Sequence, residues 1–177
     1  MDWAIDVYTI VTASLRDLPF LPAIELAAAR LLEGHAPQSV LQETTSQQDL
    51  LEAQRRGLLW VVRSDNTPVG FAHVTLREPS AAHLEEIDVH PAHGRRGLGR
   101  RLVLAVCAWA KDAGYKSVTL TTFRAVPWNM PFYAKVGFKA IPTQELGPGL
   151  RSVVESETRR GLDPARRVAM RRPTSPA

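Results

Sequence analysis

The chain has 177 residues, of which 45% are hydrophobic and 23% charged, and these values are typical of one globular domain with a sizeable core. Its single cysteine excludes a disulfide within the chain, and no apolar run is long enough to span a membrane. We therefore expect one cytoplasmic domain over residues 1–177, with its core at about 8–171 and with no metal site, because no Cys/His cluster has ligand spacing.

Charge is distributed unevenly along the chain, although the net charge is only +4. Residues 1–90 carry six basic and 13 acidic side chains, whereas residues 91–177 carry 16 basic and five acidic ones. Such asymmetry is typical of a nucleic-acid-binding tail, or of a protein that binds an anionic ligand with one half and a cationic ligand with the other. No aromatic residues are interleaved with the arginines of the basic half, which disfavours nucleic acid as a partner.

The first half of the chain predicts a strand, two helices and a hairpin. Residues 8–13 form an apolar, β-branched run, whereas residues 19–33 are rich in alanine and leucine and favour a helix. Residues 49–56 are helical by composition. Two apolar runs, at 58–63 and 69–76, flank the turn residues S-D-N-T-P and predict a β-hairpin. The segment MDWAIDVYTI lacks the basic region of a secretory leader, so we expect none.

A strand–helix–strand unit follows. Residues 84–89 predict a strand, and residues 98–113 repeat apolar side chains at three- and four-residue spacing, which indicates an amphipathic helix. Residues 117–123, SVTLTTF, predict a second strand. Since a helix separates the two strands, we expect them to pair in parallel through a right-handed crossover.

The C-terminal segment adds smaller elements. We expect a helical turn at 131–136, a strand at 138–141, a helix at 148–160 and a last strand at 167–170. Residues 171–177 should form a loose tail. The predicted fold is therefore α/β with a central mixed sheet.

The most informative motif joins the strand at 84–89 to the helix at 98–113. This turn contains three glycines and four arginines: Gly94, Arg95, Arg96, Gly97, Gly99, Arg100 and Arg101. Close backbone approach, positive charge and a helix N-terminus together favour a bound phosphate. The turn lacks the lysine and hydroxyl of a Walker loop and the third glycine of a dinucleotide fingerprint. A solvated arginine cluster is the alternative.

Two motifs carry a family resemblance. The pattern V-x-P-x-x-G-x-x-G-x-G at residues 89–99 resembles motif A of the GNAT superfamily of N-acetyltransferases, and Y-x-x-x-G-F at residues 133–138 resembles a second block of that family. The order of elements over residues 8–170 is also similar to the family pattern. The resemblance implies the GNAT fold, which is a mostly antiparallel sheet with one splayed parallel strand pair and helices on both faces. It also implies that acetyl-CoA is the acyl donor.

The resemblance further implies where acetyl-CoA binds. In relatives, the loop of motif A holds the pyrophosphate, and the splayed strand before it binds the pantetheine arm through backbone groups. The corresponding residues here are Ile87, Asp88, Val89, Gly94, Arg95, Arg96, Gly97, Leu98, Gly99, Arg100 and Asn129.

This chain departs from the family pattern at two of these positions. Gly94 stands where the family usually has Gln or Arg, and Arg95 and Arg96 are expected to compensate. Asn129 lies four residues before Tyr133, a shorter spacing than in relatives.

Amide formation from a thioester requires that the amine lose a proton, that the carbonyl be polarised and that the leaving thiolate be protonated. Tyr133 corresponds to the family's general acid, and a phenol of pKa about 10 can donate to a thiolate of pKa about 8.5. A core aromatic is the alternative for this residue. Glu85 is our candidate base, acting through water, with His83 and bulk solvent as rivals. Strand alternation places Glu85 with His83 and opposite Glu86, unless a bulge intervenes.

The sequence thus predicts an acyltransferase that moves the acetyl group of acetyl-CoA to a primary amine by direct attack in a ternary complex. The basic half would hold the CoA phosphates and the acidic half a small cationic amine. The alternatives are a protein N-terminus or lysine as acceptor, a different acyl-CoA, and a CoA-binding regulatory module without turnover. The sequence leaves the oligomeric state open, a homodimer included.

Overall fold

A computed structural model describes residues 8–175 of the chain. The first seven residues, which carry most of the segment examined for a leader, lie outside this part. The strands are β1 (Tyr8–Thr12), β2 (Leu59–Ser64), β3 (Thr67–Glu78), β4 (Ala81–Val89), β5 (Ser117–Phe123), β6 (Lys139–Ala140) and β7 (Arg167–Pro173). The helices are α1 (Leu21–Ala29), α2 (Gln38–Leu41), α3 (Gln47–Arg55), α4 (Leu98–Asp112), α5 (Met130–Lys135) and α6 (Pro148–Arg159).

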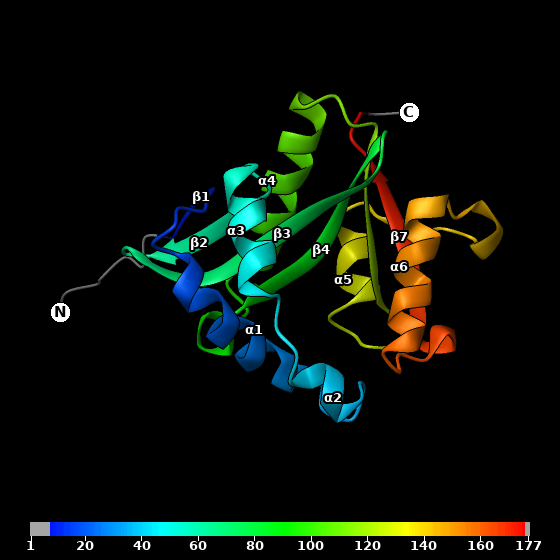
Figure 1. The fold of residues 1–177 in the computed structure, drawn as a ribbon, viewed down its shortest axis with the longest axis horizontal. Coiled ribbons are helices and arrows are strands. Elements are labelled where there is room, and N and C mark those ends of the chain that lie inside the picture. Colours follow the sequence, from blue (N-terminus) through cyan, green and yellow to red (C-terminus); the bar gives the residue numbers. More distant parts are fainter. Residues whose placement is uncertain (1–7, 176–177) are drawn as a thin grey trace.

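The strands form one mixed sheet in the order β1-β2-β3-β4-β5-β7-β6, in which β4 and β5 are the parallel pair. In Figure 1, α1, α3 and α6 lie in front of this sheet and α4 lies behind it. This arrangement confirms the predicted α/β fold, including the parallel pair and helices on both faces.

The main core lies between the sheet and its helices because each element buries one apolar face. In α4, apolar side chains three and four residues apart are fully enclosed: Leu98, Leu102, Val103, Val106 and Ala110. Leu50 and Ala53 of α3 join the same core. The hydroxyl of Ser46 begins α3 by accepting a hydrogen bond from the backbone N–H of Asp49, at 3.1 Å.

Helix α6 rests on a small core of its own, formed by Ile141, Leu146, Leu150, Val153 and Ala169. Its first turn approaches the end of β3 so closely that a Cβ on Gly149 would lie 2.4 Å from the carbonyl oxygen of Arg77. The Leu150 N–H donates to the Glu78 carboxylate at 3.2 Å. The predicted helix at 148–160 is therefore present, and it is attached to the sheet.

One expectation needs correction, and one helix was not predicted. Residues 171–173 are part of β7 and pair with β5, Pro173 opposite Ser117, so the predicted loose tail is wrong for these residues. The short helix α2 is also unpredicted, because four residues are too few to show an apolar period.

Candidate active site

The two parallel strands are hydrogen-bonded over only one end of their length. Three residue pairs join them, from Ala81 with Ser117 to His83 with Thr119. Beyond His83, β4 pairs only with β3, and beyond Thr119, β5 pairs only with β7. Backbone groups on the facing edges of the two strands are left without a strand partner, and a bound ligand can satisfy them. Ile87, Asp88 and Val89 lie on this separated part of β4.

A β-bulge lies at the point where the strands separate. His73 is opposite Glu86 and Val74 is opposite Leu84, so Glu85 is the extra residue of β4. The bulge changes which side chains share a face. Ile87 and Val89 pack against the main core together with Leu84. Because of the bulge, the simple alternation does not hold, and Glu85, Glu86 and Asp88 all line one pocket.

The glycine-rich turn leads from β4 into α4 through two left-handed backbone positions. Arg95 has φ 58° and Gly97, which caps the helix, has φ 74°. The side chains of Arg95, Arg96 and Arg100 are exposed around the helix N-terminus, whereas Leu98 is 2% exposed and offers only its backbone. Exposed cations around free helical N–H groups suit a pyrophosphate.

The turn is connected to neighbouring elements on both sides. The guanidinium of Arg101 donates to the carbonyl oxygen of Tyr8 at 2.9 Å, and Arg96 lies over the Tyr8 ring. A Cβ on Gly99 would lie 3.7 Å from the Phe132 ring, which places the start of α4 beside α5. The glycine-rich turn and the helix that carries Tyr133 therefore lie side by side. Gly94 has extended backbone, and a Cβ there would lie 3.1 Å from the carbonyl of Pro91.

We expect Gly97→Ala to weaken acetyl-CoA binding. A side chain at φ 74° is strained by about 1 kcal/mol even though no atom lies within 4 Å, and the turn can relax only by moving its N–H groups. The KM for acetyl-CoA should rise several-fold. The control is Gly114→Ala, at φ 84° with the same free space and at the other end of α4. It should lower the melting temperature without changing this KM, and an equal rise in both variants would contradict the prediction.

Tyr133 lies in α5 within an aromatic cluster. Its ring meets those of Phe132 and Phe138 edge-on, with centroids 5.0 and 5.8 Å away. Burial raises the pKa of Tyr133 well above 10, and the nearby charges of Glu86 and Asp88 raise it further. The phenol is therefore neutral and able to donate a proton. The Asn129 carbonyl accepts the Tyr133 N–H at 3.0 Å, so this asparagine starts the helix through its backbone.

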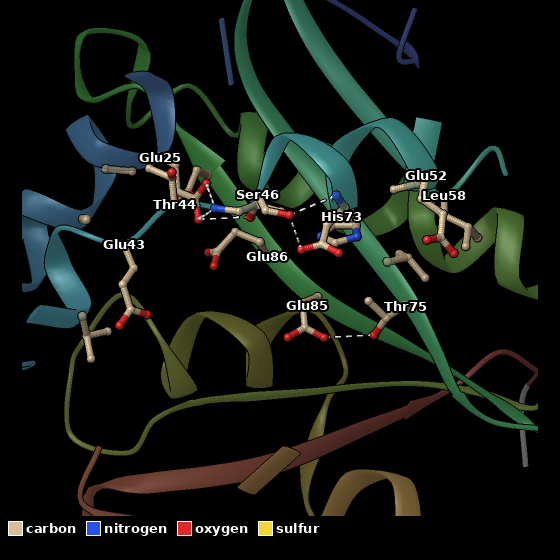
Figure 2. A pocket seen from close by; sticks show the side chains of 18 of the residues that line it. Glu25, Glu43, Thr44, Ser46, Glu52, Leu58, His73, Thr75, Glu85 and Glu86 are labelled. Carbon is tan, nitrogen blue, oxygen red and sulfur yellow. Dashed lines mark hydrogen bonds between the residues drawn. The ribbon is translucent and has the colours of Figure 1, made fainter. Parts of the chain in front are cut away.

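The pocket beside β4 has a volume of about 630 Å³ and lies between the sheet, α1, α3 and the end of α6 (Figure 2). Its lining contains seven carboxylates, namely Glu25, Glu43, Asp49, Glu52, Glu85, Glu86 and Asp88. Three arginines, Arg56, Arg77 and Arg160, also line it. The pocket lining thus has more carboxyl groups than arginines, whereas the glycine-rich turn between β4 and α4 carries exposed arginines.

The predicted base, Glu85, is held by its neighbours. Its carboxylate accepts from Arg77 at 2.7 Å and from the Thr75 hydroxyl at 2.9 Å. Burial alone would raise the pKa of Glu85, but His83, Arg77 and Thr75 outweigh it and lower the pKa. The rival base, His83, is 3% exposed and its Nδ1 lies 3.0 Å from the Thr119 hydroxyl. Burial lowers the pKa of His83 to about 4, so this ring is neutral and enclosed.

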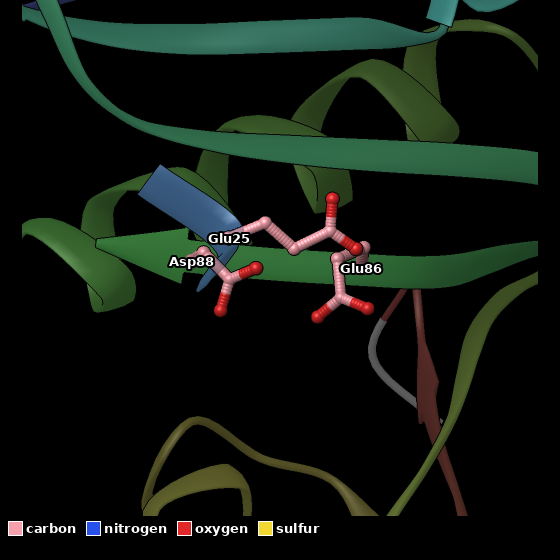
Figure 3. A group of neighbouring side chains, drawn as sticks. All are labelled: Glu25, Glu86 and Asp88. Carbon is pink, nitrogen blue, oxygen red and sulfur yellow. The ribbon is translucent and has the colours of Figure 1, made fainter. Parts of the chain in front are cut away.

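Two other carboxyl groups of β4, those of Glu86 and Asp88, have raised pKa values, in contrast to Glu85. Glu86 and Asp88 lie together with Glu25 of α1, and one oxygen of each lies within 4.8 Å of the others (Figure 3). Burial raises the pKa of Glu86 to about 7, and the charges of Glu25 and Glu85 contribute. Burial also raises the pKa of Asp88 well above its usual range, with Glu86 and Glu25 adding to the effect. A carboxylate with such a pKa can accept a proton near neutral pH.

The sequence alone did not reveal Glu25 or His73 as pocket residues. Both lie more than ten residues from the glycine-rich motif, on α1 and β3. A sign was present for Glu25, which is the one acidic residue in the alanine- and leucine-rich stretch from 21 to 32. Its burial at 8% exposure shows that this carboxylate is placed inside the protein.

Comparison with known proteins identifies the architecture. The sequence pattern of the acetyltransferase (GNAT) family matches residues 27–138. The PaiA N-acetyltransferase of Thermoplasma acidophilum, solved with coenzyme A, has a similar fold, with a TM-score of 0.73 and 19% identity over 94% of this chain and 99% of that chain. The ribosomal-protein-S18-alanine N-acetyltransferase of Escherichia coli has a TM-score of 0.66 and 21% identity, and the match covers 97% of this chain and 96% of that chain.

Curated proteins match over shorter segments. Human N-acetyltransferase 8 is 32% identical over 93 residues, which are 49% of this chain and 40% of that protein. Glucosamine 6-phosphate N-acetyltransferase of Trypanosoma brucei brucei is 31% identical over 61 residues, which are 34% of this chain and 40% of that protein. The matches thus span about 40% of the length of these relatives. Among residues 8–175, no helix is both long and apolar enough to cross a membrane.

Proposed function

Because the chain belongs to the acetyltransferase (GNAT) family, we propose that it transfers the acetyl group of acetyl-CoA to the primary amine of a small cationic acceptor. The observation that supports this proposal is that two sites of opposite charge adjoin β4. The pocket with seven carboxylates lies on the face of the sheet that α1 and α3 cover, and the basic, glycine-rich turn follows β4 and leads into α4 on the opposite face. The family match also covers both β4 and Tyr133.

The residues present fit acetyl-CoA. The turn that ends in Gly97, with exposed Arg95, Arg96 and Arg100, would bind the pyrophosphate. The free edge of β4 at Ile87–Val89 would pair with the amide groups of the pantetheine arm. Bound in this way, the donor would supply a thioester carbon at the strand gap, within reach of the pocket.

The transfer forms a carbon–nitrogen bond and breaks the carbon–sulfur bond. The incoming ammonium must first lose a proton, which a carboxylate of β4 would accept. We favour Glu86 over the sequence-based candidate Glu85. The carboxylate of Glu85 is paired with Arg77 and Thr75, whereas that of Glu86 lies beside Glu25 and Asp88. The neutral phenol of Tyr133 would protonate the departing thiolate.

The proposal is tested by following thiol release from acetyl-CoA in the presence of an amine panel. We expect turnover with small cationic amines and little with neutral or acidic amines, because seven carboxylates and three arginines line the pocket. Peptides with a free N-terminus or a lysine form the second arm of the panel. Preference for a peptide would contradict the small acceptor, and acetyl-CoA binding without any release would indicate a regulatory module.

A further inference from the structure

The arginines of the acidic pocket each have a carboxylate partner. Arg56 pairs with Glu52 at 3.3 Å, Arg77 with Glu85 at 2.7 Å, and Arg160 with Glu43. A fourth carboxylate, that of Asp49, accepts the Ser46 hydroxyl at the start of α3. The three remaining acidic side chains, Glu25, Glu86 and Asp88, form the carboxylate triad. Among the described residues that line the pocket, no cation pairs with this triad.

The triad is assembled from two elements and held in place. Glu25 projects from α1 and accepts the Thr45 N–H at 2.8 Å as well as the Thr45 hydroxyl at 3.2 Å. Glu86 and Asp88 come from β4, and their side chains lie beside that of Glu25 (Figure 3). The Oδ2 atom of Asp88 is fully buried and has no hydrogen-bond partner. Three carboxylates this close repel one another unless a cation or a proton lies between them.

His73 is a second, independent sign of a ligand beside the triad. It lines the same pocket, is opposite Glu86 in the β3–β4 register and is only 5% exposed. Its Nδ1 is buried without a hydrogen-bond partner. Burial lowers the pKa of His73, so the ring is neutral at pH 7 and does not repel a cation. A buried imidazole without a partner is costly, and a ligand N–H would satisfy it.

We propose that Glu25 and Asp88 of the carboxylate triad, together with His73, form a subsite for a second positively charged nitrogen of the acceptor, one that is not acetylated. The third member, Glu86, stays available to take the proton of the reacting amine. The substrate class is then a compound with two cationic nitrogens joined by a short apolar spacer, such as a diamine. This inference rests on the proposed acetyl transfer and specifies its acceptor.

The shape and lining of the pocket favour an organic cation over a metal ion. A volume of about 630 Å³ is far larger than an ion needs and lies in the usual range for small-molecule sites. Apolar side chains, including Ala28, Leu32, Val74 and Leu76, line the same pocket and suit methylene groups. A spacer along these side chains would allow one nitrogen to reach Glu25 and Asp88 while the other reaches Glu86 and the strand gap.

The experiment compares α,ω-diamines with monoamines of equal chain length, for example 1,4-diaminobutane with butylamine. We expect kcat/KM to be about 10- to 100-fold higher for the diamine, because a second charge-assisted contact is gained. Glu25→Gln should remove most of this preference through a higher diamine KM. The matched control is Glu52→Gln, because Glu52 lines the same pocket but is paired with Arg56. This variant should keep the higher kcat/KM for the diamine.

A binding measurement separates the subsite from the acetyl transfer. Without acetyl-CoA, 1,4-diaminobutane should raise the melting temperature of the wild-type protein and raise that of Glu25→Gln much less. If no amine causes thiol release from acetyl-CoA, the proposed function is overturned. The change in melting temperature caused by 1,4-diaminobutane still tests the subsite in that case. Equal kcat/KM for diamine and monoamine, or stabilisation by Mg²⁺ or Mn²⁺ but not by the diamine, would overturn the inference.

Discussion

Replacement of Tyr133 by phenylalanine is expected to lower kcat by about 10²- to 10³-fold, which is the usual contribution of a positioned general acid. Phe132 and Phe138 pack around the ring, so the variant keeps the same aromatic contacts and loses only the hydroxyl. The KM for acetyl-CoA should change little. Since the pKa of Tyr133 is raised well above pH 9, the phenol stays protonated from pH 6 to pH 9, and the decrease in kcat should be of similar size over this range.

The measurement for this variant is steady-state thiol release with saturating amine. Tyr115→Phe is the control, because Tyr115 packs against Trp109 at the other end of α4 and should leave the rate unchanged. A wild-type rate in Tyr133→Phe would remove this residue as the required acid and leave it as a core aromatic.

The second large effect concerns Glu86. With a pKa of about 7, this carboxyl should make the rate fall tenfold per pH unit below that value, because only the ionised form accepts a proton. We expect Glu86→Gln to lower kcat by about 10²-fold and to flatten this acidic limb. Glu85→Gln is the comparison, since its pKa is lowered by His83, Arg77 and Thr75. If the limb disappears in Glu85→Gln instead, Glu85 is the base.

The same substitution should have the opposite effect on stability. A carboxyl whose pKa is raised in the folded protein stabilises the fold at low pH, and this contribution is lost as pH rises from about 4.5 to about 7. Thermal unfolding should therefore show Glu86→Gln above wild type at pH 8, with the gap closing toward pH 4.5. Asp88, Glu25 and Glu85 share this environment, so only the difference between the two proteins is informative.

The sequence predicted the fold well because its signals are local. The spacing of apolar residues in α4 and the β-rich run of β5 each mark an element without help from distant residues. The bulge at Glu85 could not be predicted in the same way, since it depends on how β3 pairs with β4. That one residue decides that Glu85 and Glu86 share a pocket. Glu25 and His73 reach the site only through tertiary packing.

The ion pair between Arg160 and Glu43 joins the end of α6 to the segment before α3, so two walls of the pocket come from opposite ends of the chain. Both side chains are 46% exposed, and such surface pairs contribute at most about 1 kcal/mol. In the proposed function, the pocket walls from α1, α3 and the end of α6 lie outside the turn that would bind the acyl donor, and β4 belongs to both sites. A change at the end of α6 then alters the pocket wall at Arg160 and leaves the glycine-rich turn intact, so acceptor specificity can diverge or be engineered there without a change in donor binding.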